Sequence, residues 1–232
     1  MALIIRLDID RPYGRAPFAR HLLSRVSSDF YMPRLPGCGY LLELVRMLNM
    51  LNRARARAYV FFRRCTLPSN QVRDLLLAGR HEPGLHLENS RSFDTFREEM
   101  DIVENHLGAK VLAVSKHGSG GSKYGFHHYA PYEPEKYTDW AENASLRVFL
   151  GNLEDPTMVP NITNKGLLVF PSAFWLEPHW RDTNKFTVDW LLKHARSQDV
   201  VLLVHPENVL ADPDLTSDFE RIVHTLESRI VQ

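Results

Sequence analysis

Short apolar runs alternate with longer stretches of helical spacing along this chain. Residues 58–62 form a continuous apolar run of strand length, whereas apolar side chains recur at helical spacing between positions 40 and 51. Such alternation is typical of βα units around a mainly parallel sheet. The pattern predicts strands at residues 2–7, 58–62, 84–87, 110–115, 146–150, 166–170 and 200–205.

The helices between these strands have recognisable ends. Ser69 precedes one helical stretch and Gly79 follows it, while Gly108 follows another. Two segments rich in Pro, Gly and polar residues, 11–39 and 118–134, are expected to be loops. No internal repeat or low-complexity linker interrupts the chain, so we expect a single domain over residues 1–232. The predicted helices cover residues 40–51, 69–78, 93–107 and 187–196.

Polar side chains recur where the predicted strands end. In a parallel barrel these ends converge on one face, and active sites lie there. The loop at 118–134 is too long for a plain connector, which also indicates a functional face. The polar residues at strand ends are Asp8 and Asp10, Arg63 and Arg64, His86 and Glu88, His117, and His205.

The balance of charge argues against one class of partner. The 232 residues include 28 basic and 28 acidic side chains, whereas a nucleic-acid binder normally shows a basic excess. An arginine cluster is expected mainly to flank a helix and a strand in solvent, the alternative being a patch for an anionic substrate. The cluster comprises Arg53, Arg55, Arg57, Arg63 and Arg64.

The sequence carries no predicted export or membrane signal. Cys38 and Cys65 have neither metal-ligand spacing nor a disulfide framework, which fits a reducing compartment. Residues 1–8 lack the features of a signal peptide, and no run approaches the ~20 apolar residues of a membrane helix. We therefore expect a cytoplasmic protein without a membrane span.

Asp8 and Asp10 are the first candidates for chemistry. Two carboxylates this close repel each other unless a cation lies between them. One carboxylate can then bind a metal while the other acts as a general base. The alternative is a solvated pair that caps the next loop, but the apolar strand upstream favours a site.

Histidines stand at three later strand ends. His86 is a candidate metal ligand or a packed core histidine, and Glu88 lies on the same side of its strand. His117 precedes Gly118, which permits close approach to a ligand. His205 can protonate a departing amine. Residues 207–208, just beyond it, can orient it, contact the substrate or simply cap a turn.

Other residues are candidates for contact with a substrate. Lys116 can hold an anionic group or lie exposed. His128 in the long loop and Trp175 after the sixth strand can line a sugar site or serve ordinary packing. The remaining histidines are expected at the surface, including His21, His81, His106 and His194.

The order of these features resembles the polysaccharide deacetylases, carbohydrate esterase family four. The similar segments are Leu7–Asp10, Arg57–Phe62, Gly79–His86, Ser115–Gly118 and Leu202–His205. The resemblance covers roughly the whole chain. It implies an α/β fold, a deformed (β/α)7 barrel of the glycoside hydrolase/deacetylase type. By position, Asp8 matches the family's general base and His205 its catalytic acid, while Asp10 is offset by one residue from the metal aspartate.

The chain also departs from the family pattern. The family carries H-[S/T]-x-x-H, but Ser90 stands where the second histidine is expected after His86. We infer that His117 supplies this ligand, with Glu88 as the second candidate. The family's arginine-proline motif is replaced by residues 116–118, and its aspartate-tryptophan motif has no clear counterpart.

The resemblance implies a metal-dependent hydrolase that removes an N-acetyl or other N-acyl group from an amino sugar, sugar nucleotide or glycan precursor. One divalent metal is expected on Asp10, His86 and His117; zinc is the first expectation, and cobalt, nickel or manganese fit the same ligands. Two alternatives are an amidase on a non-sugar C–N bond and an inactive glycan-binding domain. The expected substrate contacts are Glu88, Lys116, His128 and Trp175.

Overall fold

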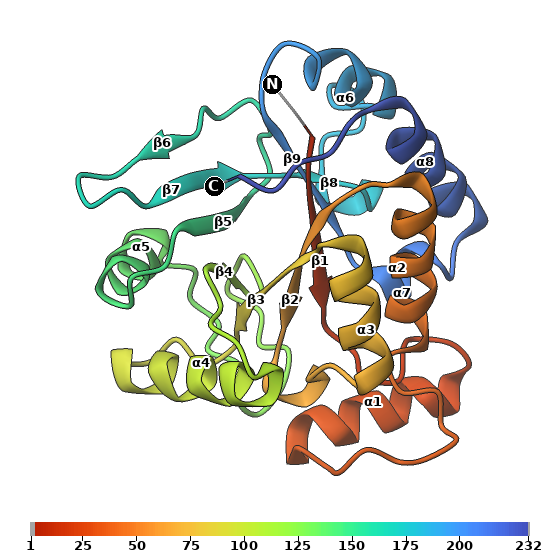
Figure 1. The fold of residues 1–232 in the computed structure, drawn as a ribbon, viewed down its shortest axis with the longest axis vertical. Helices are drawn as coiled ribbons and strands as arrows, with labels where there is room; N and C mark the ends of the chain where they lie inside the picture. Colours follow the sequence, from red (N-terminus) through yellow and green to blue (C-terminus); the bar gives the residue numbers. More distant parts are fainter. Residues whose placement is uncertain (1–2, 232) are drawn as a thin grey trace.

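The computed structural model describes residues 3–231 and contains all seven predicted strands (Figure 1). Residue 2, at the start of the first predicted strand, lies outside the described residues. The strands are β1 (Leu3–Ile9), β2 (Ala58–Phe62), β3 (Glu82–Leu87), β4 (Ala113–Lys116), β5 (Val148–Leu153), β7 (Leu168–Ser172) and β9 (Val200–Val204).

Two short additional strands determine how the sheet ends. The strand order is β6-β7-β5-β4-β3-β2-β1-β9-β8, with β6 (Asn161–Ile162) antiparallel to β7. Only Ala173 separates β7 from β8 (Phe174–Trp175), yet β7 pairs with β5 and β8 pairs with β9. Residues 168–175 therefore bridge the two sides of the curled sheet and give it seven strand positions. This confirms the expected deformed (β/α)7 barrel.

Alternation along the strands divides the core into two layers. In β1, Leu3, Ile5 and Leu7 pack in the layer beneath the helices, while Ile4 belongs to the barrel interior. Residues 6 and 8 lie on the same face of β1 as Ile4, so β1 places two charged side chains in the barrel interior. The apolar part of the interior includes Tyr59, Phe61, Leu150, Phe170 and Leu203.

The four predicted helices are present. Ser69 accepts a hydrogen bond from the Val72 amide and caps α3, and Gly108 (φ 69°) follows α4 as expected. Gly79 is the last residue of α3, and Arg80 takes the left-handed position after it. The helices are α1 (Phe18–Phe30), α2 (Leu42–Ala54), α3 (Asn70–Gly79), α4 (Phe93–Leu107), α5 (Pro134–Asn143), α6 (Val188–His194), α7 (Pro206–Val209) and α8 (Pro213–Thr225), with short 3-10 turns at Arg64–Thr66 and Pro178–Trp180.

The prediction of a loop over residues 11–39 was wrong, because this segment contains α1. Ser24 is buried in α1, whereas Phe18 and Leu22 are exposed, so apolar periodicity does not mark its inner face. In Figure 1, α1 lies across the end of the barrel at which β1 terminates. A polar inner face fits a helix that covers a site rather than a core.

Two polar residues expected at the surface are buried. Arg63 is 3% exposed and forms an ion pair with Glu88. His81 is 5% exposed; its Nδ1 accepts a hydrogen bond from the Ala58 amide and its Nε2 lies 2.8 Å from Asn52 Oδ1. Burial lowers the pKa of His81 to about 4, so the imidazole is neutral in the folded protein at neutral pH. The sequence also led us to expect His21, His106 and His194 at the surface, and these three histidines are half-buried.

No helix within residues 3–231 is both long and apolar enough to span a lipid bilayer.

Candidate active site

Four strand ends bring their polar side chains together on one face of the barrel. Asp10 follows β1, His86 lies in β3, His117 follows β4 and His205 follows β9. One oxygen of Asp10 lies within 3.2 Å of both His86 and His117, and its other oxygen lies 3.7 Å from His205 Nε2. Side chains far apart in the sequence therefore converge at the carboxyl ends of the strands.

Asp10, His86 and His117 form a possible metal site. Asp10 Oδ1 lies 2.9 Å from His117 Nδ1 and 3.2 Å from His86 Nε2, and the two nitrogens are 3.3 Å apart. Ligands about 2.0–2.2 Å from a tetrahedral ion would be roughly 3.3–3.6 Å apart, close to this spacing. Within residues 3–231, the buried Asp10 Oδ1 has no hydrogen-bond partner, which is the condition of a donor atom that a cation satisfies. The three residues fit a metal.

Ser115 orients one of these donors. Its hydroxyl lies 2.7 Å from His86 Nδ1 and donates toward Asp8 Oδ1 at 3.5 Å. Because the hydroxyl has one proton, donation to Asp8 leaves it to accept from His86 Nδ1–H. His86 Nε2 then carries the lone pair that faces the site, as a metal ligand requires.

The electrostatic surroundings keep the donors in ligand-competent forms. Burial would raise the pKa of Asp10, but His117, His86 and His205 hold it well below its ordinary value. Burial and the nearby Arg63 lower the pKa of His117. An ionised carboxylate and a neutral imidazole are the protonation states that bind a metal.

Asp8 is held from inside the barrel by Arg6. The Arg6 guanidinium donates to both Asp8 oxygens, at 2.8 and 2.6 Å, and to the carbonyls of Leu150 and Gly151. Both side chains are almost fully buried. Asp8 Oδ2 still lies 3.6 Å from His86 Nε2, so the carboxylate borders the possible metal site.

His205 forms a buried pair with Glu177. His205 Nδ1 lies 2.8 Å from Glu177 Oε1, and Asn208 donates to the same oxygen at 3.1 Å. Burial alone would lower the pKa of His205, but Glu177 and Asp10 raise it to about 10. Glu177 was not among the predicted site residues. The one signal for it in the sequence was the position of an acidic residue two places after Trp175, at the end of a strand.

Glu207 is a further acidic residue beside the histidine. It is 4% exposed, and burial together with Asp10 raises its pKa to about 8. Pro206 and Glu207 open the short helix α7, directly after His205. This position brings Glu207 into the wall of a cavity that His205 also lines.

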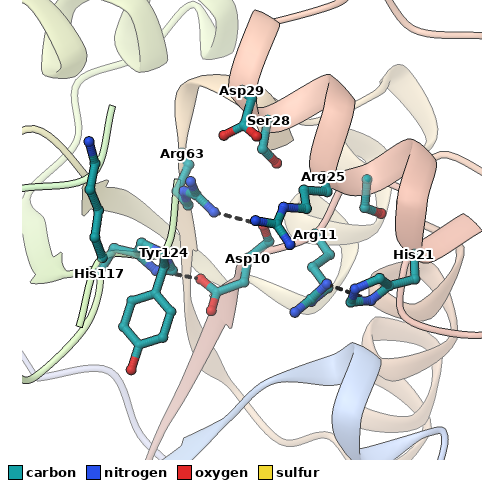
Figure 2. A pocket seen from close by; sticks show the side chains of 11 residues that line it. Asp10, Arg11, His21, Arg25, Ser28, Asp29, Arg63, His117 and Tyr124 are labelled. Carbon is teal, nitrogen blue, oxygen red and sulfur yellow. Dashed lines mark hydrogen bonds and ion pairs between the residues drawn. The ribbon is translucent and has the colours of Figure 1, made fainter. Parts of the chain in front are cut away.

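Two cavities open beside the possible metal site, and Asp10, Arg11, His117 and Tyr124 line both. The first, of about 240 Å³, extends toward α1 and includes Arg25 (Figure 2). The second, of about 250 Å³, extends toward β8 and β9. Its wall includes Trp175, Trp180, His205, Glu207 and Asn208.

Comparison with known proteins finds similarity in structure only. No family model and no curated protein sequence matches this chain. An allantoinase, PuuE, is similar with a TM-score of 0.59 and 11% identity, over 96% of this chain and 82% of that one. A family 4 carbohydrate esterase from Streptomyces lividans, in complex with acetate, has a TM-score of 0.47 and 12% identity over 100% and 93% of the two chains.

A further neighbour is a proposed glycoside hydrolase/deacetylase from Parabacteroides distasonis, with a TM-score of 0.53 and 11% identity over 97% of this chain and 66% of that one. The chain has a fold of the glycoside hydrolase/deacetylase type. This confirms the fold that the order of sequence features indicated.

On this glycoside hydrolase/deacetylase fold, the predicted site residues divide into two groups. Asp8, Asp10, His86, His117 and His205 lie together, and Trp175 lines the second cavity with its ring centre 5.8 Å from that of His205. The remaining three predicted contacts, Glu88, Lys116 and His128, line neither cavity.

These three residues are engaged elsewhere in the fold. Glu88 pairs with Arg63 and is absent from the possible metal site. Lys116 is 1% exposed, and its ammonium donates to the His117 carbonyl. His128 Nε2 lies 2.8 Å from the same carbonyl, and its Nδ1 accepts from the Tyr124 amide. Lys116 and His128 therefore contact the backbone that carries His117.

Proposed function

We propose that the protein is a metal-dependent hydrolase that removes an N-acyl group from an amino sugar or a derivative of one. The observation that carries this proposal is the convergence of Asp10 Oδ1, His86 Nε2 and His117 Nδ1, all within 3.3 Å of one another, beside two cavities. Three protein ligands of this kind are typical of catalytic zinc sites, which keep one coordination position open.

Asp10, His86 and His117 would hold the metal. When bound there, a divalent ion supplies Lewis-acid polarisation of the acyl carbonyl and lowers the pKa of the attacking water. Zinc suits a set of one carboxylate and two imidazoles, and cobalt, nickel and manganese accept the same donors.

Asp8 is assigned the role of general base. Arg6 fixes its carboxylate through two hydrogen bonds, and the Ser115 hydroxyl donates to one of its oxygens. The Asp8 carboxylate is therefore held in one orientation, bordering His86. A base held in this way takes a proton without first having to reorganise.

His205 is assigned the role of general acid. Glu177 binds Nδ1, which leaves Nε2 directed toward Asp10 and the second cavity. An Nε2–H in this place can be given to the nitrogen that leaves when the amide bond breaks. The Trp175 and Trp180 rings, 5.7 Å apart, offer apolar faces for the sugar in the same cavity.

The metal content of the purified protein tests this proposal. We expect one transition-metal ion per chain in the wild type, its loss in His86→Ala, and its retention in His224→Ala, which alters an exposed histidine of α8. The metal-loaded wild type should release acetate from N-acetylated sugars. A protein that binds no metal after incubation with zinc or cobalt would instead support an inactive glycan-binding domain.

A further inference from the structure

We propose that the first cavity binds a phosphate group carried by the substrate, through Arg11, Arg25 and Lys123. This inference rests on the proposed function and names its substrate class: a phosphorylated N-acyl sugar. The cavity adjoins the possible metal site and shares Asp10 and His117 with it. One small molecule can therefore present its acyl group to the metal site and its phosphate to the cavity.

Three of the four arginine and lysine side chains that line this cavity form no ion pair with a carboxylate within residues 3–231. Among residues 3–231, Arg25 and Lys123 form no ion pair, and the Arg11 guanidinium bonds to His21 Nδ1 rather than to a carboxylate. Arg63 also lines the cavity, but it is paired with Glu88. Arginines kept near one another without counterions are characteristic of a site that receives an anion.

Helix α1 presents one polar stripe to the cavity. His21, Ser24, Arg25, Ser28 and Asp29 all line it, and their spacing of three and four residues places them on one face of the helix. Because this face is polar, the apolar pattern of the sequence did not predict it. Its small hydroxyls leave room for a ligand, since the serines neither fill the cavity nor neutralise the arginines.

The acidic residues of the cavity do not cancel this charge. Asp10 faces the two histidines of the possible metal site. Asp29 accepts a hydrogen bond from the Phe126 amide and, within residues 3–231, forms no ion pair with the arginines. Burial and three neighbouring arginines lower the pKa of His21, which is further evidence of uncompensated positive charge around the cavity; the three are Arg11, Arg15 and Arg25.

The side-chain geometry suits a phosphate. In Figure 2 the Arg11 guanidinium is directed toward His21 and the Arg63 guanidinium donates to the Asp10 backbone carbonyl, while the Arg25 side chain extends from α1 toward the same residue. A guanidinium donates two parallel N–H groups to a tetrahedral anion, and an ammonium adds a mobile point charge. A phosphate bound there would lie next to the reacting centre without replacing a metal ligand.

Isothermal titration calorimetry tests the inference on the full chain, with and without zinc. The probes are N-acetylglucosamine 1-phosphate, unphosphorylated N-acetylglucosamine and inorganic phosphate. We expect the sugar phosphate to bind at least about tenfold more tightly than the sugar. Arg25→Ala and Lys123→Ala should each weaken sugar-phosphate binding roughly tenfold, the effect of one charged hydrogen bond. Arg46→Ala, at an exposed site of α2 outside the cavity, should leave it unchanged.

Three results would overturn the inference. The first is equal affinity for the sugar and the sugar phosphate, and the second is a higher affinity for free phosphate than for the sugar phosphate. The third is phosphate binding that requires zinc and is unchanged in Arg25→Ala, because the anion would then be bound by the metal. Failure of the proposed function gives a different pattern: no deacetylation of any probe, while sugar-phosphate binding still depends on Arg25. Arg25 is exposed, so its variants should fold, and circular dichroism checks this.

Discussion

His205 Nδ1 and Glu177 Oε1 lie 2.8 Å apart in a buried contact between the last strand end and the segment after β8. The pairing fixes which nitrogen of His205 faces the second cavity. It also supplies the acidic partner for which the sequence offered no motif. In the proposed mechanism Glu177 is therefore a positioning residue, which acts through His205 rather than on the substrate.

Replacing Glu177 by Gln should lower kcat by roughly 100-fold while leaving KM nearly unchanged, because the general acid loses its orientation and its charge partner. Metal content should stay at the wild-type level, since Glu177 lies outside the ligand set. Steady-state kinetics and elemental analysis on the same preparation check both expectations. A proportional loss of metal and activity would instead indicate a structural role.

Ser115→Ala should weaken metal binding by about tenfold or more, because the His86 ring loses the hydrogen bond that fixes its tautomer. A chelator competition assay measures the change. Ser90→Ala is the matched control: this buried serine contacts the Tyr137 hydroxyl instead. If Ser90→Ala weakened metal binding equally, the assignment of the ligand set would be wrong.

His81 should make the protein less stable in acid. Its folded pKa is about 4, whereas an unfolded histidine has a pKa near 6.5, so below about pH 6.5 the unfolded chain binds a proton that the folded chain excludes. Stability is therefore lost as the pH falls, by about 2 kcal/mol between about pH 7 and pH 5 from this residue.

Urea denaturation of the wild type and His81→Gln at these two pH values measures the contribution. The variant should start less stable at neutral pH, because Gln repeats the contacts of His81 imperfectly, but its loss on acidification should be smaller. Parallel losses in the two proteins would contradict the prediction.

Gly79→Ala should destabilise the protein by roughly 1–3 kcal/mol, the usual cost of overpacking. A Cβ at this position would overlap the Asn52 Oδ1 and His81 Nε2 atoms. Alanine gains up to about 1 kcal/mol of helix propensity over glycine, which is too little to offset displacement of that pair. A Cβ at Gly120 meets no atom of residues 3–231 within 4 Å, so Gly120→Ala should be close to neutral in the same thermal-unfolding assay.

The barrel strands were predictable because each is a short, largely apolar run. The predicted strand at residues 58–62 and the predicted helix at 93–107 have the same bounds in the structure. Apolar spacing failed for α1, whose inner face is polar, and it could not reveal that residues 168–175 serve two neighbouring strands. Closure of a sheet depends on pairing between distant segments, which local sequence does not record.

The site was predictable in part for a related reason. Asp10, His86, His117 and His205 stand at strand ends, and a parallel barrel brings those ends together whatever the connecting segments are. Two further strand-end residues, Glu88 and Lys116, contact Arg63 and the His117 carbonyl in the structure, away from both cavities. Strand position predicts the level of a side chain along the barrel, but not which partner it finds there.

The sequence alone thus determined the succession of strands, the common direction of their carboxyl ends and the residue types gathered at them, because these follow from short-range pattern and parallel topology. Only the tertiary structure decided the pairing of Glu177 with His205, the support of Asp8 by Arg6, and the placing of Arg25 beside Asp10. Each of these joins groups whose side-chain directions depend on packing of the whole barrel, so no local pattern encodes them.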